Sequence, residues 1–107
     1  MRWGRTDANQ AAIVAALRRC GASVVDLSGV GNGFPDLIVG RRTSLCASCG
    51  RNSGPSNLLI EVKDGSKPAS ARRLTEDQER FHASWKGRIW IVKSQQEIID
   101  IMERRMV

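Results

Sequence analysis

The sequence lacks any apolar run long enough to cross a lipid bilayer. Its hydrophobic stretches, of which IWIV at 89–92 is an example, fall far short of the roughly 18 residues that a membrane span requires. The first ten residues, MRWGRTDANQ, are charged and lead into an alanine-rich amphipathic stretch, without the apolar region and cleavage site of a secretory signal. We therefore expect no membrane association and a cytoplasmic location.

Acidic residues and cysteine are also scarce. Eleven Asp and Glu residues stand against seventeen Lys and Arg residues, which gives a net charge of +6. This imbalance favours polyanionic partners such as nucleic acid. Only three cysteines are present, and in a cytoplasmic protein they are expected to be reduced rather than paired in disulfides.

What the sequence does contain is enough apolar material for one small domain. The chain has 107 residues, 41% of them hydrophobic and 26% charged, close to the usual balance of a globular protein. A single core of ordinary size uses about 100 to 150 residues, so residues 1–107 are expected to form one domain. The chain shows no internal repeat.

Hydrophobic periodicity predicts seven elements in the order αβββαβα. The first helix would run through TDANQAAIVAALRRCG, with Ile13, Leu17 and Cys20 on its buried stripe. Three strands in a row, followed by a helix that crosses over to a fourth strand, indicate an α/β fold with a mixed four-stranded sheet flanked by helices. The expected strands are 23–27, 36–40, 58–63 and 88–93, the last of them buried.

Two more helices follow the third strand, each with a capping signal. The segment 74–87 has Thr75 and Gln78 in capping-box spacing, and the segment from 94 has the same spacing in Ser94 and Glu97. The tryptophans Trp85 and Trp90 are expected in the core. The single histidine of the chain, His82, is expected to be a surface or packing residue.

Two polar loops interrupt this pattern, at 41–57 and 64–73. The first contains Cys46 and Cys49, which could supply two of the four ligands of a structural zinc site, form a redox pair, or be free thiols. Both loops carry basic residues, which are either solvated or in contact with nucleic-acid phosphates. These candidates for nucleic-acid binding are Arg41, Arg42, Arg51, Lys67, Arg72 and Arg73.

Three charged residues fall where an ordinary buried strand would avoid them. If strands 36–40 and 58–63 form a hairpin, Asp36 lies beside Glu61 and Lys63, which point to the same face because strand side chains alternate. Two adjacent carboxylates repel each other unless a cation such as Mg²⁺ lies between them. A neighbouring lysine can orient an attacking water, so the group predicts metal-assisted phosphodiester hydrolysis. The alternative is a turn aspartate with a Glu–Lys ion pair at a sheet edge.

The motifs in these segments are Pro35-Asp36, then Glu61-Val62-Lys63, then the helix start LTEDQ at 74–78. Together they resemble the signature of the PD-(D/E)XK nuclease superfamily. The longer segments GFPDLIVG, LLIEVKDG and LTEDQERFHASWKG look like its VRR-NUC branch, especially the small stand-alone proteins of phages and bacteria. The resemblance covers nearly the whole chain and implies the restriction-endonuclease-like αβββαβα core, although the insertion at about 41–57 is longer than expected in this family.

The resemblance implies a role for each matching residue. Asp36, Glu61 and the backbone carbonyl of Val62 would bind Mg²⁺, for which Mn²⁺ could substitute. Lys63 would assist the nucleophilic water. Gln78 would touch the waters of the metal or the phosphate.

The resemblance leaves two points open: the direction of the Gln78 side chain and the identity of a further metal ligand. A Gln78 side chain that turns back to cap Thr75 would point less freely toward a metal. The family often adds a ligand from the first helix, and here Asp7 or Gln10 could supply it. Zinc, if bound at all, would belong to the loop with the two cysteines.

The function implied is that of a metal-dependent DNA endonuclease, which hydrolyses phosphodiester bonds by in-line attack of water and leaves a 5′-phosphate. Stand-alone relatives look like Holliday junction resolvases, so branched DNA is an expected substrate. A homodimer, which would place two sites on two strands, is also expected. Two alternatives stay open. One is a non-catalytic nucleic-acid-binding module on a nuclease fold, and the other is a zinc or redox module centred on Cys46 and Cys49.

Overall fold

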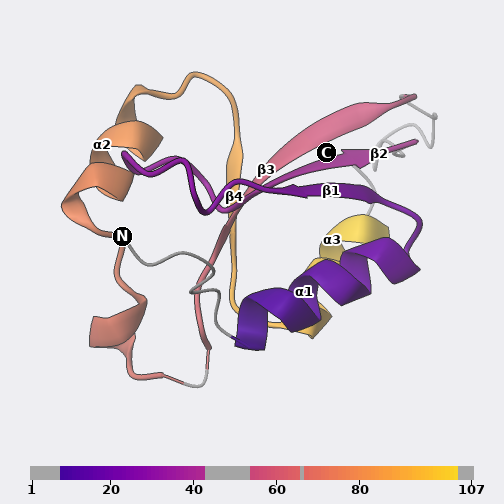
Figure 1. The fold of residues 1–107 in the computed structure, drawn as a ribbon, viewed down its shortest axis with the longest axis horizontal. Helices are drawn as coiled ribbons and strands as arrows, with labels where there is room; N and C mark the ends of the chain where they lie inside the picture. Colours follow the sequence, from indigo (N-terminus) through magenta and orange to yellow (C-terminus); the bar gives the residue numbers. More distant parts are fainter. Residues whose placement is uncertain (1–7, 43–53, 66, 104–107) are drawn as a thin grey trace.

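The computed structural model describes residues 8–42, 54–65 and 67–103, which form an α/β fold of three helices and four strands (Figure 1). The order of elements is the expected one, with a short 3₁₀ helix added in the second polar loop. The helices are α1 (Ala8–Arg19), η1 (Ala69–Arg72), α2 (Glu76–Ser84) and α3 (Gln95–Glu103). The strands are β1 (Ser23–Asp26), β2 (Leu37–Arg41), β3 (Ser56–Val62) and β4 (Ile89–Val92).

The four strands form one mixed sheet in the order β1-β2-β3-β4. The pairs β1–β2 and β2–β3 are antiparallel, and β3–β4 is parallel. The parallel pair follows from the connection, because the chain must cross over through α2 before it can run in the same direction again. The prediction of a mixed four-stranded sheet is therefore confirmed.

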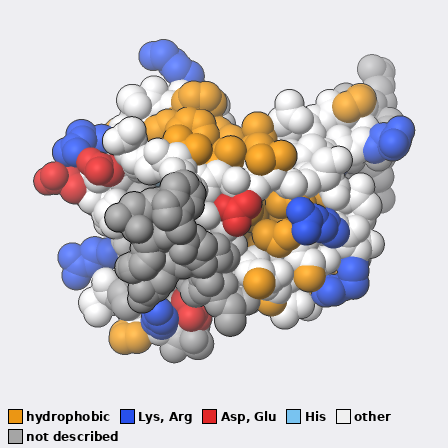
Figure 2. Space-filling view, in the orientation of Figure 1, with side chains coloured by type: hydrophobic (Ala, Val, Ile, Leu, Met, Phe, Trp, Pro, Cys, Tyr) orange, Lys and Arg blue, Asp and Glu red, His pale blue; other side chains and the backbone are white. Residues whose placement is uncertain are grey.

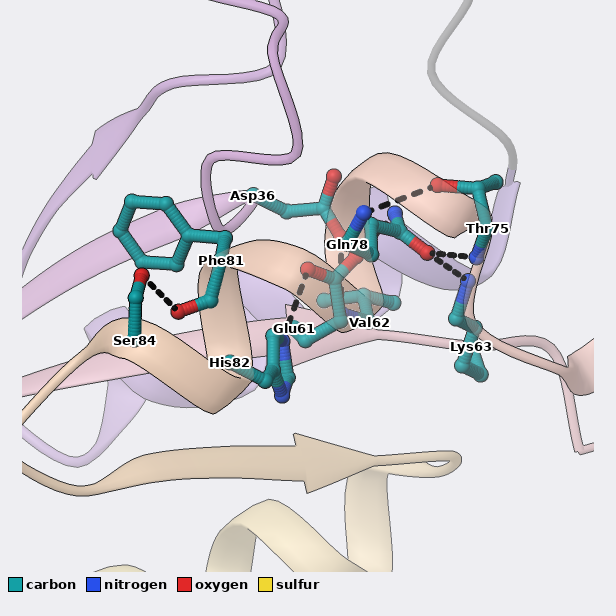
Figure 3. Close-up of polar contacts among 9 residues, drawn as sticks. All are labelled: Asp36, Glu61, Val62, Lys63, Thr75, Gln78, Phe81, His82 and Ser84. Carbon is teal, nitrogen blue, oxygen red and sulfur yellow. Dashed lines mark hydrogen bonds and ion pairs between the residues drawn. The ribbon is translucent and has the colours of Figure 1, made fainter.

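The hydrophobic core lies between one face of the sheet and the helix pair α1 and α3, which lie side by side below the strands in Figure 1. Alternate residues of β2 and β3 face these helices, as period-two patterning requires. The core residues are Ile13, Ala16, Leu17, Leu37, Val39, Leu58, Ile60, Val62, Val92, Ile98 and Ile101. The shorter helix α2 lies apart from this pair, toward the end of the sheet where β2 begins and β3 ends (Figures 1 and 3). None of the described helices is long and apolar enough to cross a membrane.

The end of the first helix differs from the prediction. The helix stops at Arg19, and Gly21 follows with a φ of +86°, a conformation that glycine adopts without strain. Cys20 therefore lies beyond the last helical turn and is exposed, so its assignment to the buried stripe was wrong. Ile13 and Leu17 are buried as expected.

The region from α2 to β4 is less buried than the sequence predicted. The helix is shorter than the segment 74–87, and none of its side chains is fully buried. Trp85 is 44% exposed, and Ile91 in β4 is 48% exposed, because β4 is an edge strand and only α1 and α3 cover the sheet broadly. The prediction of a core Trp85 was wrong, and the prediction of a buried β4 holds only for the face that carries Trp90 and Val92.

Arg41 is the other clear correction. It is the last residue of β2 and is buried, not part of a solvated loop. Its Nη1 atom donates to the Ile101 carbonyl of α3 at 3.2 Å, and its Nε atom donates to Ser56 Oγ at 3.3 Å. Burial also lowers the pKa of this guanidinium from its usual value. Arg41 thus joins the sheet to α3 and is not available to contact phosphates.

Candidate functional site

The hairpin of β2 and β3 brings Asp36 and Glu61 together. Leu37 pairs with Ile60, and the same register continued by one residue sets Asp36 opposite Glu61. The Asp36 side chain then accepts a hydrogen bond from the backbone N–H of Val62, with 2.8 Å between Oδ2 and N. The backbone carbonyl of Asp36 accepts a further bond from the N–H of Leu27 at 2.7 Å, so both neighbouring strands hold this residue in position.

Glu61 is the most buried charged residue of the group, with its side chain 1% exposed. Its Oε2 atom accepts a hydrogen bond from Gln78 Nε2 at 2.9 Å, whereas Oε1 has no hydrogen-bond partner in the described part of the chain. Burial raises the pKa of Glu61 to about 9, and Asp36 adds to the rise, because it can accept a hydrogen bond from the protonated Glu61 and its charge repels the ionised form, while Lys63 opposes the rise. Without a compensating cation, Glu61 is therefore protonated at neutral pH.

Gln78 joins the start of α2 to this site (Figure 3). Its Oε1 atom accepts from the backbone N–H of Thr75 at 2.9 Å and from Lys63 Nζ at 2.8 Å, while its Nε2 atom donates to Glu61. The backbone N–H of Gln78 donates in return to Thr75 Oγ1, which completes the predicted capping box. The expected competition between capping and the site does not occur, because the two ends of one amide serve both.

Lys63 lies just after β3, on the same face as Glu61. Its backbone N–H donates to the Val92 carbonyl at 2.9 Å, and its own carbonyl accepts from Asn9 Nδ2 at 2.7 Å. Asn9 Nδ2 also lies 3.2 Å from the carbonyl oxygen of Lys93, after β4. The first turn of α1 therefore holds the ends of β3 and β4 together and fixes the backbone from which the Lys63 side chain extends, a role that the sequence did not reveal.

His82 is a site residue that sequence reasoning missed. Its Nε2 atom lies 3.7 Å from Glu61 Oε1, and its side chain is 16% exposed. This distance is too long for a hydrogen bond, and Nε2 has no hydrogen-bond partner within the described residues. Burial, with a smaller effect of the Lys63 charge, lowers the pKa of His82, so its imidazole stays neutral to a lower pH than that of an ordinary histidine. The available signal was its spacing of four residues from Gln78, which sets both on one helix face.

The loop before β2 positions α2 through Gly33. This glycine has a φ of +77°, and a Cβ atom built on it would lie 2.2 Å from the carbonyl oxygen of Asp77 and 2.8 Å from the backbone nitrogen of Gln78. Only a residue without a side chain permits this approach. The segment GFPD thus carries both the acid, Asp36, and the surface against which the first turn of α2 packs.

The other predicted site residues are distributed as follows. Gln10 is buried and donates from Nε2 to Asp26 Oδ2 at 3.2 Å, on the face of the sheet that α1 covers, whereas Glu61 points to the opposite face. Arg42, Lys67 and Arg73 are exposed. The predictions for Asp7, Cys46, Cys49, Arg51 and the side chain of Arg72 lie outside the described residues.

The donor set suits a hard divalent cation bound by few protein ligands. In the described ranges, no group of three or more His, Cys, Asp or Glu side chains is arranged to hold a metal ion. Mg²⁺ is usually bound through one or two carboxylates, with water completing its shell, and Asp36 and Glu61 supply two. In a β-strand, the N–H and the carbonyl of one residue point to the same side. The N–H of Val62 points to Asp36, so the Val62 carbonyl points to that side too and can add a backbone oxygen. The buried Oε1 atom of Glu61, which has no hydrogen-bond partner among the described residues, fits the role of a cation ligand.

Comparison of this chain with models of protein families, with curated proteins and with solved structures finds no match. No residue role can therefore be transferred to Asp36, Glu61 or their neighbours from a relative. The function of the site is inferred from its own geometry and chemistry.

Proposed function

We propose that this protein is a divalent-cation-dependent DNA endonuclease of the PD-(D/E)XK superfamily, similar to the VRR-NUC branch. The environment of Glu61 is the observation that carries the proposal. This buried carboxyl lies beside Asp36, receives a hydrogen bond from Gln78, and keeps one oxygen without a partner among the described residues. Burial of a carboxylate beside a second acid is costly unless a cation compensates the charge, and an ordinary strand end has no need of such an arrangement.

The residues of the site have separate roles in this proposal. Asp36 and Glu61, with the Val62 carbonyl, would hold Mg²⁺ or Mn²⁺. A cation at this position would supply Lewis acidity for phosphodiester hydrolysis. Lys63, which Gln78 holds at 2.8 Å, would donate a hydrogen bond to the attacking water or to a phosphate oxygen as negative charge develops there.

Gln78 would hold Glu61 and Lys63 in fixed positions relative to each other. It contacts Glu61 with one end of its amide and Lys63 with the other, so a shift of α2 would move the acid and the ammonium group together. Catalytic groups must be held to within about 0.5 Å of their working positions, which a double hydrogen bond from a capped helix start favours.

DNA is the substrate that the charge of the chain supports best. The net charge is +6, and the exposed Arg42, Lys67 and Arg73 are candidates for contact with phosphates. Contacts of this kind release counterions from the DNA, so binding should weaken steeply as salt rises.

The proposal is tested by cleavage of labelled linear, nicked, flapped and four-way DNA with Mg²⁺ or Mn²⁺. We expect the wild type to cut at least one of these substrates, and Asp36→Ala and Lys63→Ala to lose at least about a hundredfold in rate, as removal of charge-stabilising groups usually does. Asp100→Ala is the matched control for Asp36→Ala, because Asp100 is an exposed acid of α3 outside the site.

Two results would contradict the proposal in different ways. Equal cleavage by the wild type and both site variants would show that the activity comes from elsewhere. Tight DNA binding without cleavage under any of these conditions would favour the alternative of a non-catalytic binding module with the same fold.

A further inference from the structure

Three aromatic side chains form a continuous stack beside the candidate site. Phe34 and Phe81 meet edge to face, with 5.1 Å between ring centroids, and Phe81 stacks on Trp85 at 5.4 Å with an interplanar angle of 16°. The stack begins two residues before Asp36 and ends at the C-terminal cap of α2. It therefore joins the loop that carries Asp36 to the C-terminal end of α2.

The outer end of this stack is aligned with the site along α2. Gln78, His82 and Trp85 follow one another at spacings of four and three residues, which sets them on one side of the helix. Gln78 and His82 both approach Glu61 (Figure 3). With a rise of about 1.5 Å per residue, Trp85 lies about 10 Å along the axis from Gln78.

Trp85 is both ordered and accessible. Its 44% exposure is high for an indole that is stacked on a neighbouring ring, and the residues that follow it, Lys86 and Arg88, are exposed too. The Arg88 guanidinium lies 3.9 Å from the centre of the Trp90 ring, which keeps its charge near this turn. Figure 2 shows hydrophobic side chains gathered on the upper part of one face, with a basic side chain projecting beside them.

We propose that Trp85 is a stacking platform for an unpaired nucleobase of the substrate, with Lys86 and Arg88 as contacts for the adjoining phosphates. This inference rests on the proposed function and adds to it a substrate class, namely nucleic acid with a single-stranded segment next to the bond that is cut. An exposed aromatic face flanked by basic residues is the usual means of binding single strands without reading their sequence. Bases inside a duplex are already stacked on each other and do not offer a free face.

The alternative occupant of this surface is a second copy of the chain, which would also cover exposed apolar side chains. We favour the nucleobase because positive charge flanks the exposed tryptophan. Like charges would face each other across a symmetric contact between two copies.

The experiment compares affinities in EDTA, so that no cleavage occurs, for a single-stranded oligonucleotide and for a duplex of the same sequence. Fluorescence anisotropy of labelled DNA gives both constants. We expect Trp85→Ala to weaken single-strand binding at least about fivefold, the lower limit for loss of one stacked base, and to change duplex binding less than twofold. Trp85→Phe should restore most of the loss, since a smaller ring still stacks.

Ile91→Ala is the matched control, since Ile91 is a similarly exposed apolar side chain that is not aromatic. Loss of affinity in this control, an equal loss for duplex and single strand, or no loss at all in Trp85→Ala would overturn the inference. So would a lower molecular mass of Trp85→Ala than of the wild type in sedimentation without DNA, which would identify the surface as a contact between copies. If the wild type cleaves DNA and Trp85→Ala binds both DNAs normally, only this inference fails; if the wild type binds neither DNA, the proposed function fails as well.

Discussion

Gln78 shows how a single side chain can complete a helix cap and also hold two charged groups. Thr75 and Gln78 were predicted as a capping box from their spacing, and Glu61 and Lys63 were predicted on one face from strand alternation. These relations are local and therefore visible in the sequence. The contact of His82 with Glu61 was not predicted, because it depends on how α2 is placed over β3.

The two roles of Gln78 can be separated by a pair of substitutions. Thr75→Ala removes the side-chain cap and should cost about 1 kcal/mol of unfolding free energy, but it leaves the bonds of Gln78 to Glu61 and Lys63. Gln78→Leu also abolishes those bonds and leaves a buried oxygen of Glu61 without its donor, so it should cost more, up to about 3 kcal/mol. At equal fractions of folded protein, we expect only Gln78→Leu to lose cation-dependent cleavage. Equal cleavage by the two variants would reject a role of Gln78 in the site.

The raised pKa of Glu61 has a consequence for stability. The pKa is about 9 in the folded protein, against 4.5 for an unperturbed glutamate. Between these values the folded state binds more protons than the unfolded state, so the free energy of unfolding should fall as pH rises from about 4.5 to about 9. We expect calorimetric scans in EDTA to show this decline in the wild type relative to Glu61→Gln, whose amide does not titrate. Parallel pH profiles for the two proteins would show that Glu61 is not buried as described.

At the scale of elements, the β2–β3 hairpin and α1 were the most predictable. Their apolar residues recur with the period of a strand or a helix, and one face of each is fully covered. β4 misled the prediction because its apolar run is typical of a central strand, although β4 lies at the sheet edge. Trp85 misled it for a related reason, since its spacing from Phe81 reflects stacking along α2 and not burial in the core.

The contact between the β1–β2 loop and α2 can be tested with two glycines. Gly31 and Gly33 both have a φ of +77°, so alanine introduces similar backbone strain at each. A Cβ at Gly33 would also collide with the Asp77 carbonyl, whereas a Cβ at Gly31 would meet nothing within 4 Å. We therefore expect Gly33→Ala to displace the first turn of α2 and to have a cleavage rate at least tenfold lower than that of Gly31→Ala.

Cleavage rates of the two glycine variants should be compared at equal fractions of folded protein, measured by circular dichroism. Similar rates in both variants would mean that the close approach of Gly33 does not position Gln78.

At the scale of the whole molecule, positive charge is spread widely. On the face drawn in Figure 2, Lys and Arg side chains are scattered and do not form one patch. The sequence predicted the excess of positive charge but not which basic residues are free for DNA, because burial of Arg41 depends on the packing of α3 against the sheet. The homodimer stays a prediction, which sedimentation of the purified protein can measure.

Substitution of the adjacent arginines Arg41 and Arg42 should affect different properties, folding stability for Arg41 and DNA binding for Arg42. Arg41→Ala removes two hydrogen bonds of a buried side chain and should lower the free energy of unfolding by about 1 to 3 kcal/mol. Arg42→Ala should change stability by less than about 0.5 kcal/mol and lower the salt dependence of DNA binding by about one unit of slope. Urea unfolding and affinity titrations at several salt concentrations measure these effects, and the reverse assignment of the two effects would contradict the structure.

The central claim is that the buried Glu61 and the neighbouring, half-buried Asp36 together bind a divalent cation. Cleavage can fail because the wrong DNA was offered, but cation binding needs no substrate, so calorimetric titration with Mn²⁺ near pH 7.5 tests this claim most directly. We predict saturable binding by the wild type with release of up to about one proton per ion, seen as a dependence of the heat on the ionisation enthalpy of the buffer, because Glu61 must ionise to bind. Glu61→Gln should lose this binding, and Glu79→Gln, a change at an exposed glutamate of α2, should keep it. Equal Mn²⁺ binding by the wild type and Glu61→Gln, or none by the wild type, would contradict the account.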